Sequence, residues 1–347
     1  MSIHSIVRHT RYILFVLLTT LATLHAGQSA GMTAQEIVAK WRNAIHKTTE
    51  LSAAKISSTS NEDGIPGTID EWMTTSGSYR TIVKREFDTS EIVCTNDFAK
   101  RRDWNGFVRT IERKELNRLR TEIFEDKAIV FGPPELMPEA TVADSGDQFP
   151  YELHIVVPNG TPMTWYIDKK TWLPVKSART GDDSKITTTY EDWRESDGMI
   201  RPHHFVVTET DKPDYTIELT SIEMLENLPP ESFAAPTPGP SDTHIDAEVP
   251  PIPFNFENSH IIFNIRLNNS EPILFLFDTG ADQEVINTPH LSEFGLQTYG
   301  KTTTTGGGGS ADYSYARGAT FRLPGVEIRN QHVSILDESG LERAYGM

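Results

Sequence analysis

The chain has 347 residues, of which 37% are hydrophobic and 23% charged, a balance that excludes a disordered polyelectrolyte and a polytopic membrane protein. Its formal charge of −17 argues against the basic face that phosphate backbones require, so we expect no nucleic-acid partner. One cysteine, Cys94, excludes an intrachain disulfide and a multi-cysteine metal site. The length predicts two domains or three.

The first 30 residues have the pattern of a signal peptide. A positively charged start precedes an apolar run over residues 12–24, and small residues follow, with cleavage points at Ala26 or Ala30. The alternative, a membrane anchor, needs about 20 apolar residues, and this run is shorter. No cysteine stands directly after the run, so a lipobox is absent. We therefore expect an exported protein, periplasmic or secreted.

Residues 33–235 combine helical and strand patterns. A capping-box spacing, Thr33 to Glu36, opens a predicted helix over residues 33–48, and a second helix is predicted over 111–130. Short strands separated by glycines are predicted from about 52 to 110. Further strands are predicted at 151–157, 163–167, 185–190, 204–208 and 215–219. The pattern predicts an α+β domain, a curved antiparallel sheet with covering helices.

Residues 236–251 form the core of a proline-rich stretch that contains eight prolines between Pro229 and Pro253. Such a composition favours a semi-rigid extended linker. The alternative is a proline-rich recognition motif for a partner. We place the domain boundary here.

Residues 252–347 read as an all-β domain. Alternating or buried strands are predicted at 261–267 and 272–277, a glycine-rich hairpin at 302–320 and further strand at 326–336, with a short helix or turn over 289–294.

The sequence Asp278-Thr279-Gly280 follows the second of these strands directly. The tripeptide alone is weak evidence, but its place at a strand end is informative. Gly280 can bring its N–H close to the carboxylate without a steric clash. Two such carboxylates about 3 Å apart share one proton, so that one serves as a general base and the other as a general acid.

The segment 275–287 and the preceding strands at 253–263 resemble the retropepsin-like aspartic proteases, in particular the bacterial aspartyl-protease group. The resemblance implies an exported aspartic endopeptidase that hydrolyses peptide bonds in a homodimer. By that resemblance Asp278 is the catalytic acid, Thr279 makes the grip between subunits, and Gly280 supports the carboxylate. Ala281 keeps the approach to the substrate narrow.

The glycines Gly306, Gly307, Gly308 and Gly309 lie where this family has its flap, a hairpin that closes over bound peptide. They are the further substrate-binding candidates. The alternative is an ordinary flexible loop.

The family's usual hydrophobic-hydrophobic-Gly strand does not follow Asp278 within the sequence, and Phe321–Gly325 is a poor substitute. We therefore expect this domain to be C-terminally incomplete, which leaves the activity of the chain open.

The segments 165–174 and 228–233 resemble hairpin and exit sequences of LolA-like carriers of outer-membrane lipoproteins. The resemblance covers residues 33–235 and implies a half-open barrel that shelters an acyl-chain ligand. The alternative is a β-rich domain that only positions the protease. The second function hypothesis is accordingly a periplasmic lipid or lipoprotein carrier with an inactive protease-like module.

Three further groups give no site. His203 and His204 are adjacent on a predicted strand, so they point to opposite faces and do not form a metal pair. The acids at 192–197 lack the spacing of a calcium loop. Cys94 has no basic neighbour that would activate it. We expect neither a metal nor a cofactor.

Overall fold

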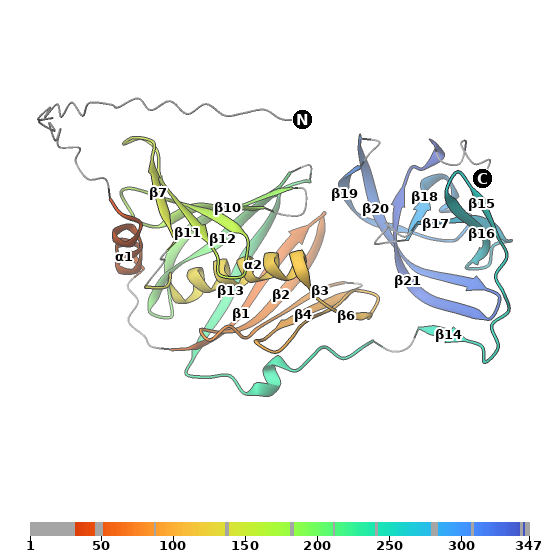
Figure 1. Ribbon diagram of the computed structural model, residues 1–347, viewed down its shortest axis with the longest axis horizontal. Helices are drawn as coiled ribbons and strands as arrows, with labels where there is room; N and C mark the ends of the chain where they lie inside the picture. Colours follow the sequence, from red (N-terminus) through yellow and green to blue (C-terminus); the bar gives the residue numbers. More distant parts are fainter. Residues whose placement is uncertain are drawn as a thin grey trace, which may run out of the picture. The chain divides into compact units, whose positions relative to one another are not determined.

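The structure, a computed structural model, describes residues 32–45, 51–86, 88–135, 139–180, 184–210, 212–239, 242–278, 284–306, 309–340 and 343 (Figure 1). Only the backbone is described at 304–306 and 309–310. The described chain is mostly β, with two α-helices, α1 (Ala34–Ala44) and α2 (Arg113–Phe131). No described helix has the length and apolar character needed to cross a membrane. The expected signal peptide, residues 1–30, lies outside the described residues.

Thirteen of the described strands form one antiparallel sheet that curves around α2 (Figure 1). Its strand order is β6-β5-β4-β3-β2-β1-β13-β12-β11-β10-β9-β8-β7, so the first and last long strands, β1 and β13, pair in the middle. The bounds are β1 (Ala53–Glu62), β2 (Ile65–Thr74), β3 (Tyr79–Arg85), β4 (Thr89–Cys94), β5 (Ala99–Arg102), β6 (Val108–Thr110), β7 (Thr141–Asp144), β8 (Tyr151–Val156), β9 (Pro162–Ile167), β10 (Pro174–Thr180), β11 (Lys185–Ser196), β12 (Met199–Glu209) and β13 (Tyr215–Leu225).

Helix α1 begins at the predicted capping box. The Thr33 hydroxyl accepts the backbone N–H of Glu36, and the Glu36 carboxylate accepts the backbone N–H of Thr33. The buried side of the helix carries Trp41, whose ring meets that of Trp165 on β9 edge to face, with centroids 4.7 Å apart. The predicted helix over 33–48 is confirmed as α1, and its last residues lie outside the described ones.

Helix α2 confirms the helix predicted over 111–130 and packs on the sheet through Leu119 and Ile123. Gly160, in the turn between β8 and β9, allows the close approach of this helix. A Cβ at position 160 would lie 2.6 Å from the Thr121 hydroxyl oxygen, which accepts the backbone N–H of Thr161 at 2.7 Å. A glycine is therefore required at this contact.

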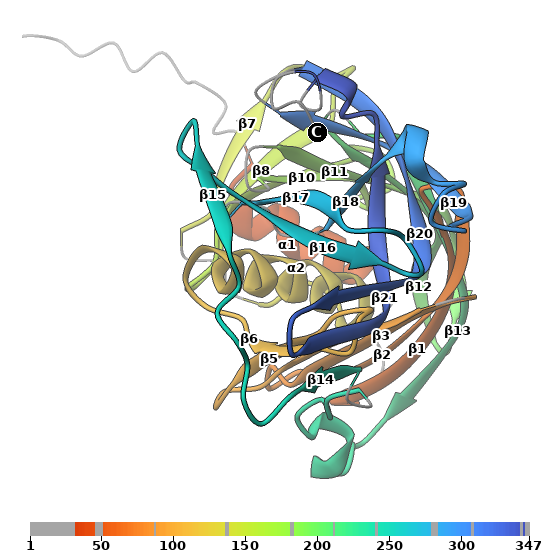
Figure 2. The ribbon, with the colours of Figure 1, turned by 90° about the vertical axis from the view of Figure 1, so that its right-hand side faces the viewer.

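The remaining strands form an eight-stranded sheet with the order β14-β21-β20-β16-β15, in which β17 pairs with β16, β18 with β21 and β19 with β20. Figure 2 shows β20 and β21 side by side. The bounds are β14 (Thr243–Ile245), β15 (Phe254–Glu257), β16 (His260–Leu267), β17 (Ile273–Phe277), β18 (Val285–Asn287), β19 (Thr298–Gly306), β20 (Gly309–Leu323) and β21 (Val326–Leu336). Its core contains Leu267, Ile286, Phe321 and Ile335.

The sequence pattern located most of these elements. The five strands predicted between residues 151 and 219 are confirmed as β8, β9, β11, β12 and β13. Within the expected proline-rich linker, however, Thr243–Ile245 forms β14 and pairs with β21. The short helix or turn expected over 289–294 begins as the 3-10 helix η2 (Thr288–His290), and a second one, η1 (Pro230–Phe233), follows β13. The α+β class expected for the N-terminal part is observed as a mostly β structure with curved antiparallel strands and two helices.

Candidate functional site

Asp278 lies at the end of β17, where its side chain is exposed. Strand β17 is fixed in register by β16, with Ile261 opposite Phe277. The apolar residues Val285 and Ile286, a few positions after the Asp-Thr-Gly sequence, belong to β18, which runs parallel to β21 and buries Ile286 in the core. Both ends of the loop that starts at Asp278 are thus anchored by sheet pairing. Thr279, Gly280 and Ala281, the other sequence-predicted residues of this loop, lie outside the described residues.

Two residues of the predicted flap segment are described, Gly306 at the end of β19 and Gly309 at the start of β20. The two strands are antiparallel, and Gly306 stands opposite Gly309 at the last described pair. Gly307 and Gly308 lie outside the described residues. The hairpin expected from the glycine run is therefore present, and its role as a flap stays a prediction.

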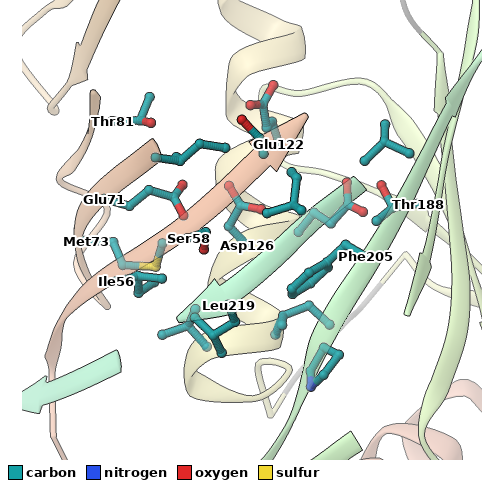
Figure 3. A pocket seen from close by; sticks show the side chains of 18 of the residues that line it. Ile56, Ser58, Glu71, Met73, Thr81, Glu122, Asp126, Thr188, Phe205 and Leu219 are labelled. Carbon is teal, nitrogen blue, oxygen red and sulfur yellow. The ribbon is translucent and has the colours of Figure 1, made fainter. Parts of the chain in front are cut away.

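A second candidate site, which the sequence reasoning missed, is a cavity of about 280 Å³ between α2 and the curved sheet (Figure 3). Alternate residues of β1, β2, β3, β12 and β13 point into it, because successive side chains of a strand face opposite sides. Its apolar lining includes Ile56, Ile69, Met73, Val83, Ile92, Ile129, Phe205, Val207, Ile217, Leu219 and Ile222.

The cavity also contains an unusual number of carboxyl groups. Figure 3 shows Glu122 and Asp126 on α2 and Glu71 on a strand of the sheet. Glu71 accepts a hydrogen bond from the Tyr79 hydroxyl at 2.7 Å, and Glu122 lies 3.9 Å from the Arg179 guanidinium. Acidic side chains of a helix and a facing sheet therefore share one partly apolar space.

Burial changes the acidity of these groups. Burial is the main cause that raises the pKa of Glu71 to about 7, aided by the charge of Glu122 and opposed by the hydrogen bond from Tyr79. The pKa of Asp126 is raised well above its ordinary value, first by burial and then by the charges of Glu71, Glu122 and Glu125. Burial therefore favours the protonated form of both carboxyls.

One acid of the cavity wall is held in a closed network. Buried Glu125 accepts hydrogen bonds from Ser177, from the Tyr190 hydroxyl at 2.6 Å and from Arg179 Nε at 3.1 Å. With its oxygens engaged in this way, Glu125 supports the wall and is not available to a ligand.

Sequence signals for the cavity exist but are weak. Glu71 stands between Ile69 and Met73 on one face of a strand, and Glu122 and Asp126 are one turn apart on a helix. An acidic residue within an apolar row of a strand is such a signal. The sequence does not show, however, that this strand and this helix enclose the same space.

The other candidates from the sequence remain outside both sites. His203 is buried and contacts the Arg201 backbone carbonyl, whereas His204 faces Glu218 across the sheet. Cys94 is buried, and this burial raises the pKa of its thiol.

Comparison with known proteins finds one family model that matches the C-terminal part. Residues 263–345 match the family model of the aspartyl proteases, and this match confirms the resemblance of that segment to these enzymes. The matched residues include Asp278 and the β19–β20 hairpin. A comparison with curated protein sequences gave no significant match.

Similar solved structures include a LolA superfamily protein from Nitrosomonas europaea, with 12% identity over 58% of this chain and 98% of that chain and a TM-score of 0.36. A DUF1329 family protein from Desulfovibrio piger has 11% identity over 58% of this chain and 95% of that chain, with a TM-score of 0.38. The MucA/MucB complex structure of Pseudomonas aeruginosa has 11% identity over 89% of this chain and 96% of that chain, with a TM-score of 0.25. LolA-like proteins, which the sequence segments at 165–174 and 228–233 resemble, are thus among the similar structures.

Proposed function

We propose that the chain is an exported aspartic endopeptidase in which Asp278 supplies one half of a two-carboxyl dyad. The observation that carries this proposal is the place of Asp278: it ends a sheet-anchored strand inside the segment that matches the aspartyl protease family. One carboxylate takes a proton from a bound water, which attacks the peptide carbonyl carbon. The other carboxyl gives its proton to the carbonyl oxygen.

The second carboxyl would come from a second copy of the chain. An exposed aromatic row next to Asp278 supports this homodimer. Phe256 and Phe277 flank Ile261 on neighbouring strands and are 68% and 52% exposed, and Phe254 follows on the same face of β15. Exposed apolar rows of this kind mark interaction surfaces, and two-fold symmetry would bring both copies of Asp278 together. The hairpin tip at Gly306–Gly309 would then act as a flap over the substrate.

Activity of the full chain toward a mixed peptide library tests the proposal. Asp278→Asn removes the titratable carboxyl and should lower the cleavage rate roughly 10²–10⁴-fold, the range that a general acid–base group contributes. Asp246→Asn, an exposed acid near β14, is the matched control and should cleave like the original chain. Equal cleavage by the Asp278→Asn chain would refute the assignment.

A second candidate function is the binding of an acyl-chain ligand by the N-terminal part, and the apolar cavity favours it. At about 280 Å³ the cavity is slightly smaller than typical ligand pockets, which span about 300–1,000 Å³. In this view α1, α2 and the curved sheet form the half-open shelter of a carrier. Extraction of the purified chain followed by mass spectrometry for acyl chains, and titration with dodecanol, test it. Absence of both extracted chains and dodecanol binding would contradict it.

We also propose export, on the sequence of residues 1–30. Amino-terminal sequencing of the protein from a periplasmic or culture fraction should begin after Ala26 or Ala30. An intact start in that fraction would contradict the signal peptide.

A further inference from the structure

The cavity between α2 and the thirteen-stranded sheet has a charge imbalance in an otherwise apolar wall. We propose that it selects a single-chain amphiphile with an ammonium head group, which Glu71, Glu122 and Asp126 receive. The proposal rests on the ligand-binding function proposed for the cavity and adds the charge of the ligand to it.

The basic groups of the wall are already engaged. Arg179 donates to Glu125 at 3.1 Å, and its guanidinium lies 3.9 Å from Glu122. Arg201 is 1% exposed and donates to backbone carbonyls, that of Val130 at 3.2 Å among them. Neither guanidinium is placed to receive an anionic head group.

The acidic groups, by contrast, exceed their partners. Glu62 pairs with Arg85, and Glu125 belongs to the closed network with Ser177 and Tyr190. Three carboxyls remain. Glu71 accepts a hydrogen bond from the Tyr79 hydroxyl, and Glu122 lies 3.9 Å from the Arg179 guanidinium. Asp126 has no hydrogen bond or salt bridge among the described residues.

An ammonium ion would supply the positive charge that this group of carboxyls lacks. In surroundings of low dielectric constant, unpaired carboxylates repel one another, and a cation placed between them relieves that repulsion. An ammonium group also donates hydrogen bonds to carboxylates and accepts none. An alkanoate head group would add a further negative charge. The net charge of −17 attracts cationic ligands over a longer range.

The raised pKa values of Glu71 and Asp126 agree with this arrangement, because a bound cation favours the ionised carboxyls. Binding of an ammonium head group near neutral pH should therefore release protons to the buffer. The titratable and charged side chains that face these two groups from α2 and the sheet are Glu62, Tyr79, Glu122, Glu125, Arg179, Tyr190, Arg201 and Tyr215.

The apolar part of the cavity wall would contact the hydrocarbon tail of the ligand. Ile56, Met73, Phe205 and Leu219 lie on several strands around the same space (Figure 3). A volume of about 280 Å³ suits one hydrocarbon chain better than several.

Calorimetric titration of the full chain with three probes of equal chain length tests the proposal. The probes are dodecylammonium, dodecanol and dodecanoate at pH 7, the two ions below their micelle concentrations and the alcohol below its solubility limit. We expect dodecylammonium to bind at least tenfold more tightly than dodecanol, about 1.4 kcal/mol, and dodecanoate to bind most weakly. The measured heat in two buffers of different ionisation enthalpy should show proton release for dodecylammonium alone.

Variants separate charge selection from binding itself. The double change Glu71→Gln and Asp126→Asn should bring the ammonium-to-alcohol ratio close to one, and measurable dodecanol binding by this variant shows that the cavity still forms. Glu223→Gln, an exposed acid of β13 away from the cavity, should keep the original ratio. Dodecanol binding without an ammonium preference would overturn the proposed charge selection only. Failure of both dodecanol and dodecylammonium to bind would overturn the ligand-binding function as well.

Discussion

The acidic side chains of the two candidate sites differ in their surroundings: Asp278 is exposed, whereas Glu71 and Asp126 line a cavity. Asp278 is exposed at the end of β17, and its chemistry depends on a local sequence that can be read directly from the chain. Glu71 and Asp126 lie more than fifty positions apart and meet only because β2 and α2 enclose the same space. Asp278 can therefore be identified from its local sequence alone. The pKa values and hydrogen-bond partners of Glu71 and Asp126 depend on how the whole domain folds.

The largest effect is expected at the acid that the fold encloses most completely. Glu125→Ala removes the acceptor of three hydrogen bonds and leaves the Arg179 charge without its closest carboxylate. Breaking a buried pair in this way should lower the free energy of unfolding by about 3–5 kcal/mol. All six tryptophans lie between Trp41 and Trp193, so urea unfolding followed by tryptophan fluorescence reports on this sheet. A loss below about 1 kcal/mol would show that the network is not stabilising.

The next effect is a pH dependence caused by Glu71. Its pKa of about 7 in the folded chain lies above the ordinary value of 4.5, so the folded chain holds the proton more tightly than the unfolded chain. The contribution of Glu71 to stability is then largest below about pH 4.5, falls as pH rises toward 7, and is constant above it. We expect Glu71→Gln to remove roughly 1–3 kcal/mol of that fall, measured as the difference between the two stability curves. Parallel curves between pH 4 and 8 would contradict the raised pKa.

A smaller effect concerns the exposed aromatic row beside Asp278. Phe256→Asp places a charge in the proposed dimer surface and should weaken self-association at least tenfold, about 1.4 kcal/mol. Sedimentation equilibrium of the full chain measures it. Phe149→Asp changes another exposed phenylalanine, in the turn between β7 and β8, and is the control that should associate normally. Equal association of the two variants would place the dimer surface elsewhere.

The contrast also explains how much could be predicted from the sequence. The Thr33–Glu36 capping box and the apolar periodicities located α1, α2 and most strands, because these signals act within a few residues. The place of Asp278 directly after a strand was predicted for the same reason, and its catalytic role stays a prediction. The short strand β14 was missed because its residues, Thr243–Ile245, owe their extended pairing to β21, some eighty positions away.

The cavity was missed for a related reason. Strand β1 shifts register against β13 between Ser57 and Ser58, and the lining residues of β13 change phase there, from Leu219 to Ile222. No local sequence pattern predicts such a shift in register. An acid such as Glu71 within an apolar row reads as a solvent-facing residue until the pairing shows that the row faces inward.

The smallest effect on stability is expected at Glu115, an acid that is neither fully exposed like Asp278 nor part of the cavity wall. Glu115 receives two hydrogen bonds from Arg109, at 2.6 and 2.8 Å, but the two side chains are 26% and 43% exposed. Although burial raises the pKa of Glu115, the hydrogen bonds from Arg109 and the nearby arginine charges bring it below its ordinary value. The contribution of this pair to stability is therefore present above the ordinary pKa and is lost as the pH falls, opposite in sign to that of Glu71.

Solvent screening limits the size of that contribution. Glu115→Gln should cost about 0.3–1 kcal/mol at pH 7 and almost nothing at pH 3, in urea unfolding followed by tryptophan fluorescence. Comparison with Glu125→Ala then separates an acid that the fold encloses from one that it leaves at the surface. A loss at pH 3 as large as that at pH 7 would mean that Glu115 stabilises the helix through packing and not through its charge.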